Sequence, residues 1–445
     1  MKRSKFIVIL LITAAGAFGI FATYNRQQNV AQQFAMPELI QRSAGLSPEE
    51  FSFVQKQYAD LQKKIANNPN DIDAYSSLAQ LFIGEARVTG NHHYYYPAAE
   101  KIIDEALRRA PNNFIANATK ASILMTYHQF QKAETVINSA ITQNQYNAYA
   151  YGVLCDAQTE LGKYDDAVKT CDKMLSIRPG LSAYARASYQ RELHGDVNGA
   201  ANAMKMAAEA GLQGQENREW ALYNLANIYL NQGKLDTAAF LYRGILQERP
   251  NYGFALSGLA QVEAARGNYD SAAELLVKAS QLTPEHIFLE QLADIYAATG
   301  QTESANAITS KVLDAFQQHE KDGWDVDKEY AMFCCNHNTN LPQSLERAKN
   351  EYNRRPDNID ALDAYAWALY KNGKASDAIP YIEKTLRLNT ANPVFIYHAG
   401  LIYNAAGDNA KATQFLQRAA GPHSFLPVIY MGEAQKNLQT LAHKA

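Results

Sequence analysis

The feature that most constrains this chain is a residue pattern that returns every 34 residues. Between Glu219 and Pro284 it occurs twice in register, with Ala226, Gly233, Ala238 and Pro250 returning as Ala260, Gly267, Ala272 and Pro284. Between these marks lie two segments of helical apolar periodicity, 220–231 and 235–247, joined by a short turn that contains glycine. Glycine allows the chain to reverse, and small residues allow two helices to approach closely. The pattern therefore predicts a repeated antiparallel helical hairpin.

Small residues mark the same hairpin along most of the chain. In the first helix of each unit they are Ala79, Ala121, Cys155, Ser188, Ala226, Ala260, Ala293, Met332, Ala366 and Gly400. In the second helix they are Ala99, Ala133, Ala167, Ala200, Ala238, Ala272, Ala305, Ala378 and Ala412. Insertions at 90–97, 211–217 and 321–328 interrupt the period, and we expect the first of them to lengthen the turn inside the first hairpin. A chain of 445 residues built in this way is expected to grow by stacking.

The repeats also set the predicted segment boundaries. Residues 47–70 begin with Ser-Pro-Glu-Glu, the order of a capped helix start, and are expected to form an N-terminal capping helix. Repeats are predicted at 71–212, 213–320 and 357–426, with a degenerate repeat at 321–356 that lacks the turn glycine and the second alanine. Residues 427–445 are expected to form a C-terminal capping helix. The predicted fold class is an all-α solenoid of about nine to ten hairpins.

The repeat marks resemble the tetratricopeptide repeat over roughly residues 70–425. The runs 183–196, 364–370 and 397–402 are similar to a family of bacterial multi-repeat proteins of uncharacterised function that share this order of units. The resemblance implies a right-handed solenoid that serves protein interaction. It implies no catalytic residues.

The N-terminal 24 residues have the composition of an export signal. Three basic residues, Lys2, Arg3 and Lys5, precede an uncharged apolar run over 6–24. Two interpretations remain open: a signal peptide cleaved near Ala15-Gly16-Ala17, or an uncleaved anchor in the inner membrane formed by residues 6–24. Both place the body of the protein outside the cytoplasm, in the periplasm or cell envelope. Residues 25–46 are rich in Gln and Asn and are expected to form a polar linker.

Several function classes find no support in the sequence. A net charge of −3 and a pI near 6.4 argue against nucleic acid as a partner. The sequence contains no phosphate-binding loop, no zinc-protease motif and no nucleophile elbow, so we predict no enzyme activity, catalytic residue or cofactor. His92 and His93 lie beside three tyrosines but lack further ligands at suitable spacing. We therefore expect a surface loop there and no metal site.

The cysteines allow two interpretations. Cys155 and Cys171 lie on the two helices of one predicted hairpin, at a level where a disulfide is geometrically possible. Packing as two small core residues is the favoured alternative. Adjacent cysteines form a strained bridge, so buried packing is also expected for Cys334 and Cys335.

The predicted partner-binding face is the exposed side of the first helices, which in stacked hairpins lines a concave groove. Its candidate residues are Tyr149, Asp156, Glu160, Tyr189, Glu192, Trp220, Tyr223, Asn227, Asn231, Phe254, Gln261, Glu290, Asp294, Asp360, Asp363, Trp367, Tyr370, Tyr397 and Asn404. Seven of these are carboxylates, against one lysine, Lys371, so the groove is expected to be acidic and aromatic. The predicted ligand is a protein or peptide with basic residues. The alternative is a carbohydrate or small molecule stacked on Trp220, Tyr223, Trp367 and Tyr370.

Overall fold

The computed structural model describes residues 34–42 and 46–443 of the chain. It divides into two units, 1–40 and 41–445, and every described helix belongs to the second unit. This described part contains 22 α-helices, one short 3₁₀ helix (Leu386–Leu388) and no strand. The predicted all-α class is therefore confirmed.

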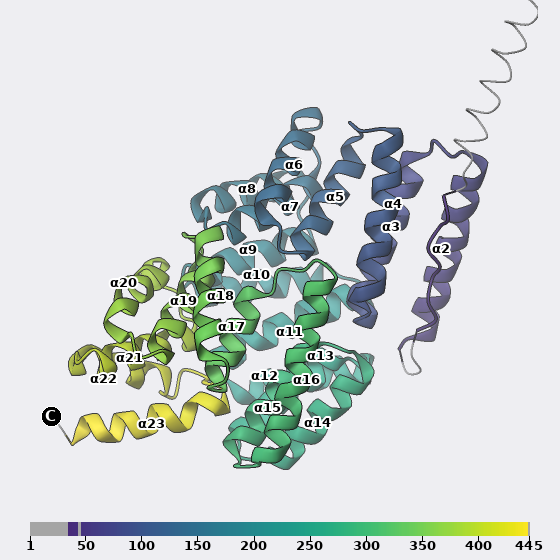
Figure 1. Cartoon of the computed structure of the whole chain (residues 1–445). Coiled ribbons are helices and arrows are strands. Elements are labelled where there is room, and N and C mark those ends of the chain that lie inside the picture. The colour runs from purple at the N-terminus through teal and green to yellow at the C-terminus, as the bar shows by residue number, and fades with distance from the viewer. Residues whose placement is uncertain (1–33, 43–45, 444–445) are drawn as a thin grey trace, which may run out of the picture. The chain divides into compact units, whose positions relative to one another are not determined.

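Twenty of the helices pair into ten antiparallel hairpins, in which the two helices of each pair pack on one another. The pairs are α3 (Ile72–Thr89) with α4 (His92–Arg109), α5 (Phe114–Thr126) with α6 (Phe130–Gln143), α7 (Ala148–Glu160) with α8 (Tyr164–Ile177), α9 (Leu181–Leu193) with α10 (Val197–Glu209), α11 (Glu216–Asn231) with α12 (Leu235–Glu248), α13 (Gly253–Ala265) with α14 (Tyr269–Leu282), α15 (His286–Ala298) with α16 (Thr302–Lys321), α17 (Asp327–Asn336) with α18 (Leu341–Arg354), α19 (Ile359–Lys371) with α20 (Ala375–Thr385), and α21 (Pro393–Ala405) with α22 (Asn409–Ala419). Helix α2 (Pro48–Asn67) precedes this array and α23 (Val428–Ala442) follows it (Figure 1).

The small residues lie where the two helices of a hairpin cross. Ala226, Ala238, Ala260 and Ala272, for example, are fully buried. Where the small residue is polar, it bonds to the partner helix: Ser188 Oγ donates to the Ala200 carbonyl at 2.7 Å, and Cys155 Sγ donates to the Ala167 carbonyl at 3.4 Å. Close crossing of this kind explains why the 34-residue pattern needs small side chains.

The first insertion does not have the predicted effect. Gly90 adopts the left-handed conformation and ends α3, and α4 begins at His92, so the turn is short. The extra residues lengthen both helices to 18 residues instead of forming a surface loop. In the degenerate unit, α17 and α18 still form a hairpin, because Asn338 and Asn340 take positive φ angles of 51° and 48° where other turns use glycine.

Hairpins far apart in the sequence also contact one another within the unit 41–445. The turn inside each of the first five hairpins lies against a connection that follows a hairpin five places later. The contacting pairs are Gly90 with Thr283, His128 with Asp325, Gly162 with Asp357, Gly195 with Asn389, and Gly233 with Pro422. We call these five contacts the seam. They show that the array completes a superhelical turn every five to six repeats.

Hydrogen bonds also cross the seam, and the two described here join residues 193 and 195 positions apart. His92 Nε2 lies 2.7 Å from Glu285 Oε1, and the Ile359 amide donates to the Tyr164 hydroxyl at 2.9 Å. Beside that bond, Tyr164 and Leu193 pack with Ile359 and Phe395 in one buried apolar cluster. The seam therefore combines polar bonds with apolar burial.

Residues 1–24 and most of the predicted linker lie outside the described residues. Among the helices that the structure describes, none is both long and apolar enough to cross a membrane.

Candidate partner-binding face

The candidate residues lie on the first helices of the hairpins, and first helices of neighbouring hairpins contact one another. First helices of distant hairpins also face each other. The Tyr189 hydroxyl on α9 lies within electrostatic range of Asp360 on α19 and of Glu160 on α7. We call the surface that carries the predicted residues the inner face.

Most of the predicted residues are accessible on the inner face. Tyr149 and Tyr189 are the most exposed of its aromatic residues, at 37% and 40%. A second set is half-buried: Asp156, Glu160, Glu192, Trp220, Tyr223, Asn227, Asn231, Phe254, Gln261, Glu290, Asp294, Asp360, Tyr370 and Asn404. The accessible surface thus keeps the predicted combination of aromatic rings, amides and carboxylates.

Three predicted residues are not accessible, and their assignment to the partner-binding face is corrected here. Asp363 and Trp367 are 1% exposed and Tyr397 is fully buried. The Trp367 indole donates to Asn336 Oδ1 at 2.9 Å and stacks on the ring of His398. Helical periodicity places these side chains on the inner side, but contacts with neighbouring first helices then cover them. Because Trp367 is buried, it is also not available to stack on a carbohydrate, as the alternative prediction requires for Trp220, Tyr223, Trp367 and Tyr370.

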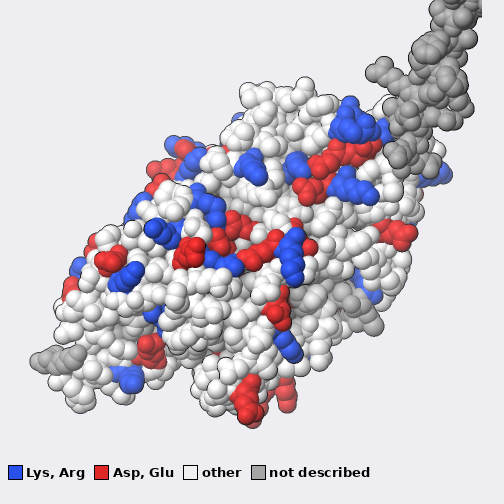
Figure 2. Space-filling model, in the orientation of Figure 1, with Lys and Arg blue, Asp and Glu red and all other residues white. Residues whose placement is uncertain are grey.

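Most carboxylates on the inner face have a partner, but three of these partners are histidines, which carry a charge only when protonated, so the acidic character of this face stays a prediction. Five of the seven carboxylates have a basic partner: Asp156 with Arg186 at 2.5 Å, Glu160 with Arg355, Glu290 with His286 at 2.7 Å, Asp294 with His337 at 3.1 Å, and Asp363 with His398 at 3.0 Å. On the face shown in Figure 2, basic and acidic side chains are likewise interleaved.

Glu192 and Asp360 form no ion pair with any described residue. Burial raises the pKa of the Glu192 carboxyl, and a hydrogen bond from Asn231 partly opposes that rise. Both carboxylates lie within electrostatic range of Tyr189, which is the more exposed of the two exposed inner-face tyrosines. This part of the inner face therefore combines an exposed ring with two carboxylates that form no direct ion pair among the described residues, although Lys328 and Arg355 lie within electrostatic range of Asp360.

Sequence reasoning missed the basic residues that neutralise the other acids. Arg186 lies 34 residues after Gly152, so it occupies the equivalent position one repeat later, and its guanidinium also bonds to the Gly152 carbonyl. Comparing each repeat with the next would have found it. Arg355 reaches Glu160 across the seam, at a separation of 195 residues, and no signal at the 34-residue period indicates that contact.

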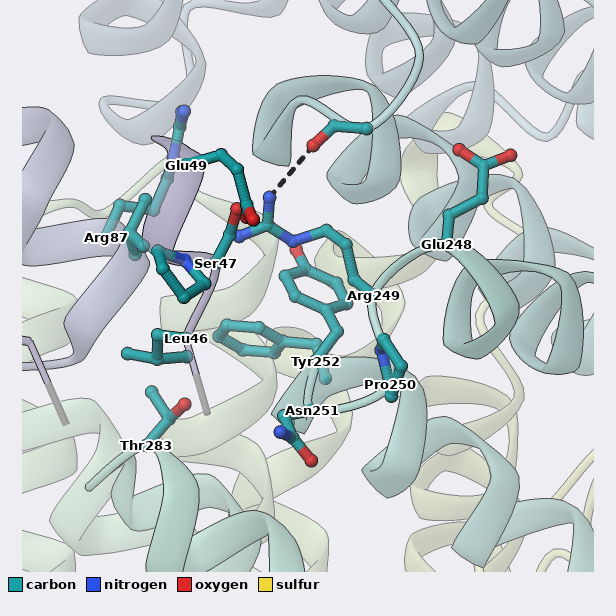
Figure 3. A pocket seen from close by; sticks show the side chains of 15 residues that line it. Leu46, Ser47, Glu49, Arg87, Glu248, Arg249, Pro250, Asn251, Tyr252 and Thr283 are labelled. Carbon is teal, nitrogen blue, oxygen red and sulfur yellow. Dashed lines mark hydrogen bonds between the residues drawn. The ribbon is translucent and has the colours of Figure 1, made fainter. Parts of the chain in front are cut away.

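A cavity of about 310 Å³ lies between α2, α3 and the connection from α12 to α13, and Phe254 is the inner-face residue that lines it (Figure 3). The Arg249 guanidinium crosses it and bonds to Glu50 at 3.1 Å and to the Gly214 carbonyl at 3.0 Å. Tyr252 donates to Glu216 Oε1 at 3.2 Å beside it. Its polar groups bind one another, so we assign the cavity to the packing of α2 against the hairpins.

The remaining sequence candidates form structural contacts. All four cysteines are buried free thiols, and the Cys155–Cys171 pair is not joined by a disulfide. His92 and His93 bond to Glu285 and Asp322, in contacts between α4 and the α15–α16 region. No group of three or more potential ligands suitable for a metal ion occurs among residues 34–42 and 46–443.

Family models described as tetratricopeptide repeat match residues 220–242, 232–287 and 364–427. The chain contains tetratricopeptide repeats. These matches cover the stretch from which the 34-residue period was first derived and the last two hairpins of the array.

Curated relatives share the repeats over different lengths. Cellulose synthase operon protein C of Komagataeibacter sucrofermentans is 35% identical over 83 residues, which are 19% of this chain and 6% of that protein. A TPR repeat-containing protein of Methanocaldococcus jannaschii is 22% identical over 375 residues, 80% of this chain and 51% of that protein. The matches thus span about half or less of the length of these relatives.

Solved structures that match this chain include the Cut9–Hcn1 hetero-tetramer of the APC/C, at 13% identity and a TM-score of 0.37, with 89% of this chain and 97% of that chain covered. The human IFIT1 dimer with m7Gppp-AAAA matches at 15% identity and a TM-score of 0.47, with 76% and 77% covered.

Proposed function

We propose that this chain is a non-enzymatic scaffold of the cell envelope that binds a protein or peptide through its inner face. Arrays of tetratricopeptide repeats are typical protein-interaction scaffolds, and the accessible inner face offers aromatic rings and amides suited to an extended or helical peptide. The export part of the proposal rests on the basic-then-apolar order of residues 1–24.

One observation supports a ligand with a basic side chain. Tyr189 is 40% exposed and lies within electrostatic range of Glu192 and Asp360, two carboxylates that form no direct ion pair in the described part of the chain. A lysine or arginine of a partner would supply the missing counter-charge and contact the tyrosine ring. Because the other five acids are already paired, we expect one basic side chain to matter far more than the total charge of the ligand.

The test uses the full chain and a set of 15-residue peptides that differ at one central position, which is Arg, Lys or Gln. We expect peptides with central Arg or Lys to bind, and Gln at that position to weaken binding about tenfold. The double variant Glu192→Gln/Asp360→Asn should lose the same tenfold, as measured by fluorescence anisotropy. The control Asp236→Asn changes a carboxylate that is 97% exposed on α12 and should bind like the parent chain.

Two outcomes would contradict the proposal. If no peptide binds, or if the double variant binds as the parent does, the site around Tyr189 is not the recognition point. A thermal-shift screen with oligosaccharides tests the second candidate, because stabilisation by sugars and not by peptides would favour carbohydrate binding on Trp220, Tyr223 and Tyr370.

A further inference from the structure

The dipeptide Arg-Pro occurs at three connections between hairpins. In the described part of the molecule, the arginine side chain bonds to other residues at only two of these connections. The connections begin at Arg178, Arg249 and Arg355, each directly after the second helix of a hairpin. Because they occupy equivalent places in the repeat, they offer an internal comparison. The groups that bind Arg249 and Arg355 therefore indicate which groups would bind Arg178.

Arg249 and Arg355 are buried, and each binds a glutamate that lies 199 or 195 residues away in the sequence. Arg355 is 4% exposed, and its guanidinium bonds to the Glu160 carboxylate and, at 3.1 Å, to the Glu160 carbonyl at the end of α7. Arg249 is 8% exposed and bonds to Glu50 at 3.1 Å and to the Gly214 carbonyl at 3.0 Å. Arg355 also bonds to Glu351 on α18, so each guanidinium binds at least one carboxylate and one backbone oxygen, as its fork geometry favours.

The Arg355 connection receives the turn of a hairpin. Two residues after Glu160, Gly162 lies so close to Asp357 that an added Cβ would be 2.2 Å from the Asp357 carbonyl carbon. Two residues further, the Tyr164 hydroxyl accepts from the amide of Ile359, the first residue of α19. The turn that binds at this connection therefore has the sequence pattern Glu-x-Gly-x-Tyr, formed by Glu160, Gly162 and Tyr164.

The connection at Arg178 also has an Arg-Pro dipeptide before the first residue of a helix, but no turn of another hairpin lies against it in the described part of the chain. The Arg178 side chain is exposed and makes no hydrogen bond or ion pair with any residue that the structure describes. A Cβ added at Gly180 meets no atom within 4 Å, and Leu181, the first residue of α9, is half-buried where Ile359 is fully buried. A cavity of about 790 Å³ lies here, lined also by Tyr146 and Tyr149, of which Tyr146 is 80% exposed.

We propose that the surface formed by Tyr146, Tyr149, Arg178, Pro179 and Leu181 docks the turn of a helical hairpin belonging to a second protein. That turn carries a glutamate two residues before its glycine and a tyrosine two residues after it. The glutamate binds the Arg178 guanidinium, and the glycine allows the backbone to approach the connection as Gly162 approaches Asp357. This surface lies at the end of the hairpins opposite to their turns; it shares Tyr149 with the inner face but includes none of Tyr189, Glu192 and Asp360.

A second copy of this chain fits the site poorly. Its turn glycines outside the seam are Gly267, Gly300, Gly373 and Gly407. The residues two positions before them are Ala265, Ala298, Lys371 and Ala405, so none supplies the glutamate. Lysine at this place would face Arg178 with like charge. The chemistry therefore favours a different protein with a similar hairpin.

The probe is a synthetic hairpin with the sequence of residues 148–177, which contains Glu160, Gly162 and Tyr164, cross-linked between its helices and checked for helicity by circular dichroism. We expect it to bind the full chain, and we expect Arg178→Ala in the full chain to weaken binding at least tenfold. The hairpin with Glu160→Gln should lose a similar factor. The control Arg191→Ala removes an exposed arginine of α9 that already bonds to Asp196, and it should leave binding unchanged.

The inference is overturned if the helical hairpin fails to bind, or if it binds the Arg178→Ala chain as well as the parent. It is also overturned if sedimentation shows that the full chain self-associates and that Arg178→Ala abolishes this, because the partner would then be a second copy. Loss of binding by Arg178→Ala together with unchanged peptide binding at Tyr189 would support this surface independently of the proposed function.

Discussion

The turns of the first five hairpins and those of the last five share a backbone conformation but differ in their surroundings. Gly162, Gly195 and Gly233 have positive φ angles and lie against backbone atoms of a later hairpin, at distances that leave no room for a Cβ. Gly267, Gly300, Gly373 and Gly407 have similar φ angles, and an added Cβ would meet no atom within 4 Å. Glycine therefore serves local chain reversal in the second group, and both reversal and long-range contact in the first.

The largest expected effect comes from filling a seam turn. Gly162→Ala should lower the free energy of unfolding by about 4 kcal/mol, because a left-handed alanine costs about 1–2 kcal/mol and the added methyl group displaces the Asp357 backbone for about 1–3 kcal/mol more. The matched variant Gly373→Ala should cost about 1 kcal/mol. Urea denaturation measures both, and equal losses would show that the seam does not form in solution.

Removing a seam arginine is the next largest change. Arg355→Ala leaves the Glu160 carboxylate without an ion-pair partner and leaves Glu351 with Arg354 alone, and it should cost about 3 kcal/mol. Arg178→Ala changes the equivalent residue at the open connection and should cost less than about 0.5 kcal/mol. The two variants should differ in melting temperature accordingly, and a large loss for Arg178→Ala would argue against an exposed, unpaired side chain.

Acid should weaken the seam through His319, which stacks on Trp324 and lies beside His93 and His286. Burial, reinforced by these neighbouring histidines, lowers the pKa of His319 to about 4. Since the unfolded chain binds a proton near pH 6.5 that the folded chain does not, stability from this group is complete above pH 6.5 and is lost as the pH falls towards 4, by about 2–3 kcal/mol.

The variant His319→Phe keeps the ring contact and should reduce the acid sensitivity between pH 6.5 and 4.5, measured as the free energy of unfolding at each pH. His423→Phe alters an exposed histidine and should leave the pH profile unchanged. Glu290 raises the pKa of His286, which stabilises the protonated form and opposes the His319 effect, so the comparison between variants is more informative than the profile of the parent chain. Identical slopes for His319→Phe and the parent would contradict this account.

The smallest expected effects differ in sign between the two groups of turns. Asn338→Gly relieves a left-handed asparagine in an exposed turn outside the seam and should stabilise the chain by about 0.5 kcal/mol. His128→Gly relieves the same backbone strain in a seam turn but removes the hydrogen bond to the Asp325 carbonyl and the stack on Phe130. It should therefore destabilise the chain by about 1 kcal/mol. Thermal denaturation measures both changes. If both variants were stabilised, or both destabilised, the predicted difference between the two groups of turns would be wrong.

The sequence predicted the hairpins well because each depends on residues close together in the chain. The pattern around Ala226 and Gly233 determines where helices cross and where they turn, and both effects act within one repeat. It predicted the inner face less well. Helical periodicity places Trp367 and Tyr397 on the correct side of their helices, but neighbouring helices decide whether such residues stay exposed. The pairing of Glu160 with Arg355 depends on the superhelical pitch, which no single repeat encodes.

The seam has a consequence for how this chain can be shortened or extended. In an open stack of hairpins each unit depends on its two neighbours, and units can be added or deleted one at a time. Here, deleting one hairpin between Gly162 and Asp357 would shift one side of the contact by a whole unit, so that Glu160 would no longer face Arg355. The array should thus behave as one indivisible body, whose evolution by gain or loss of single repeats is restricted to its outermost hairpins.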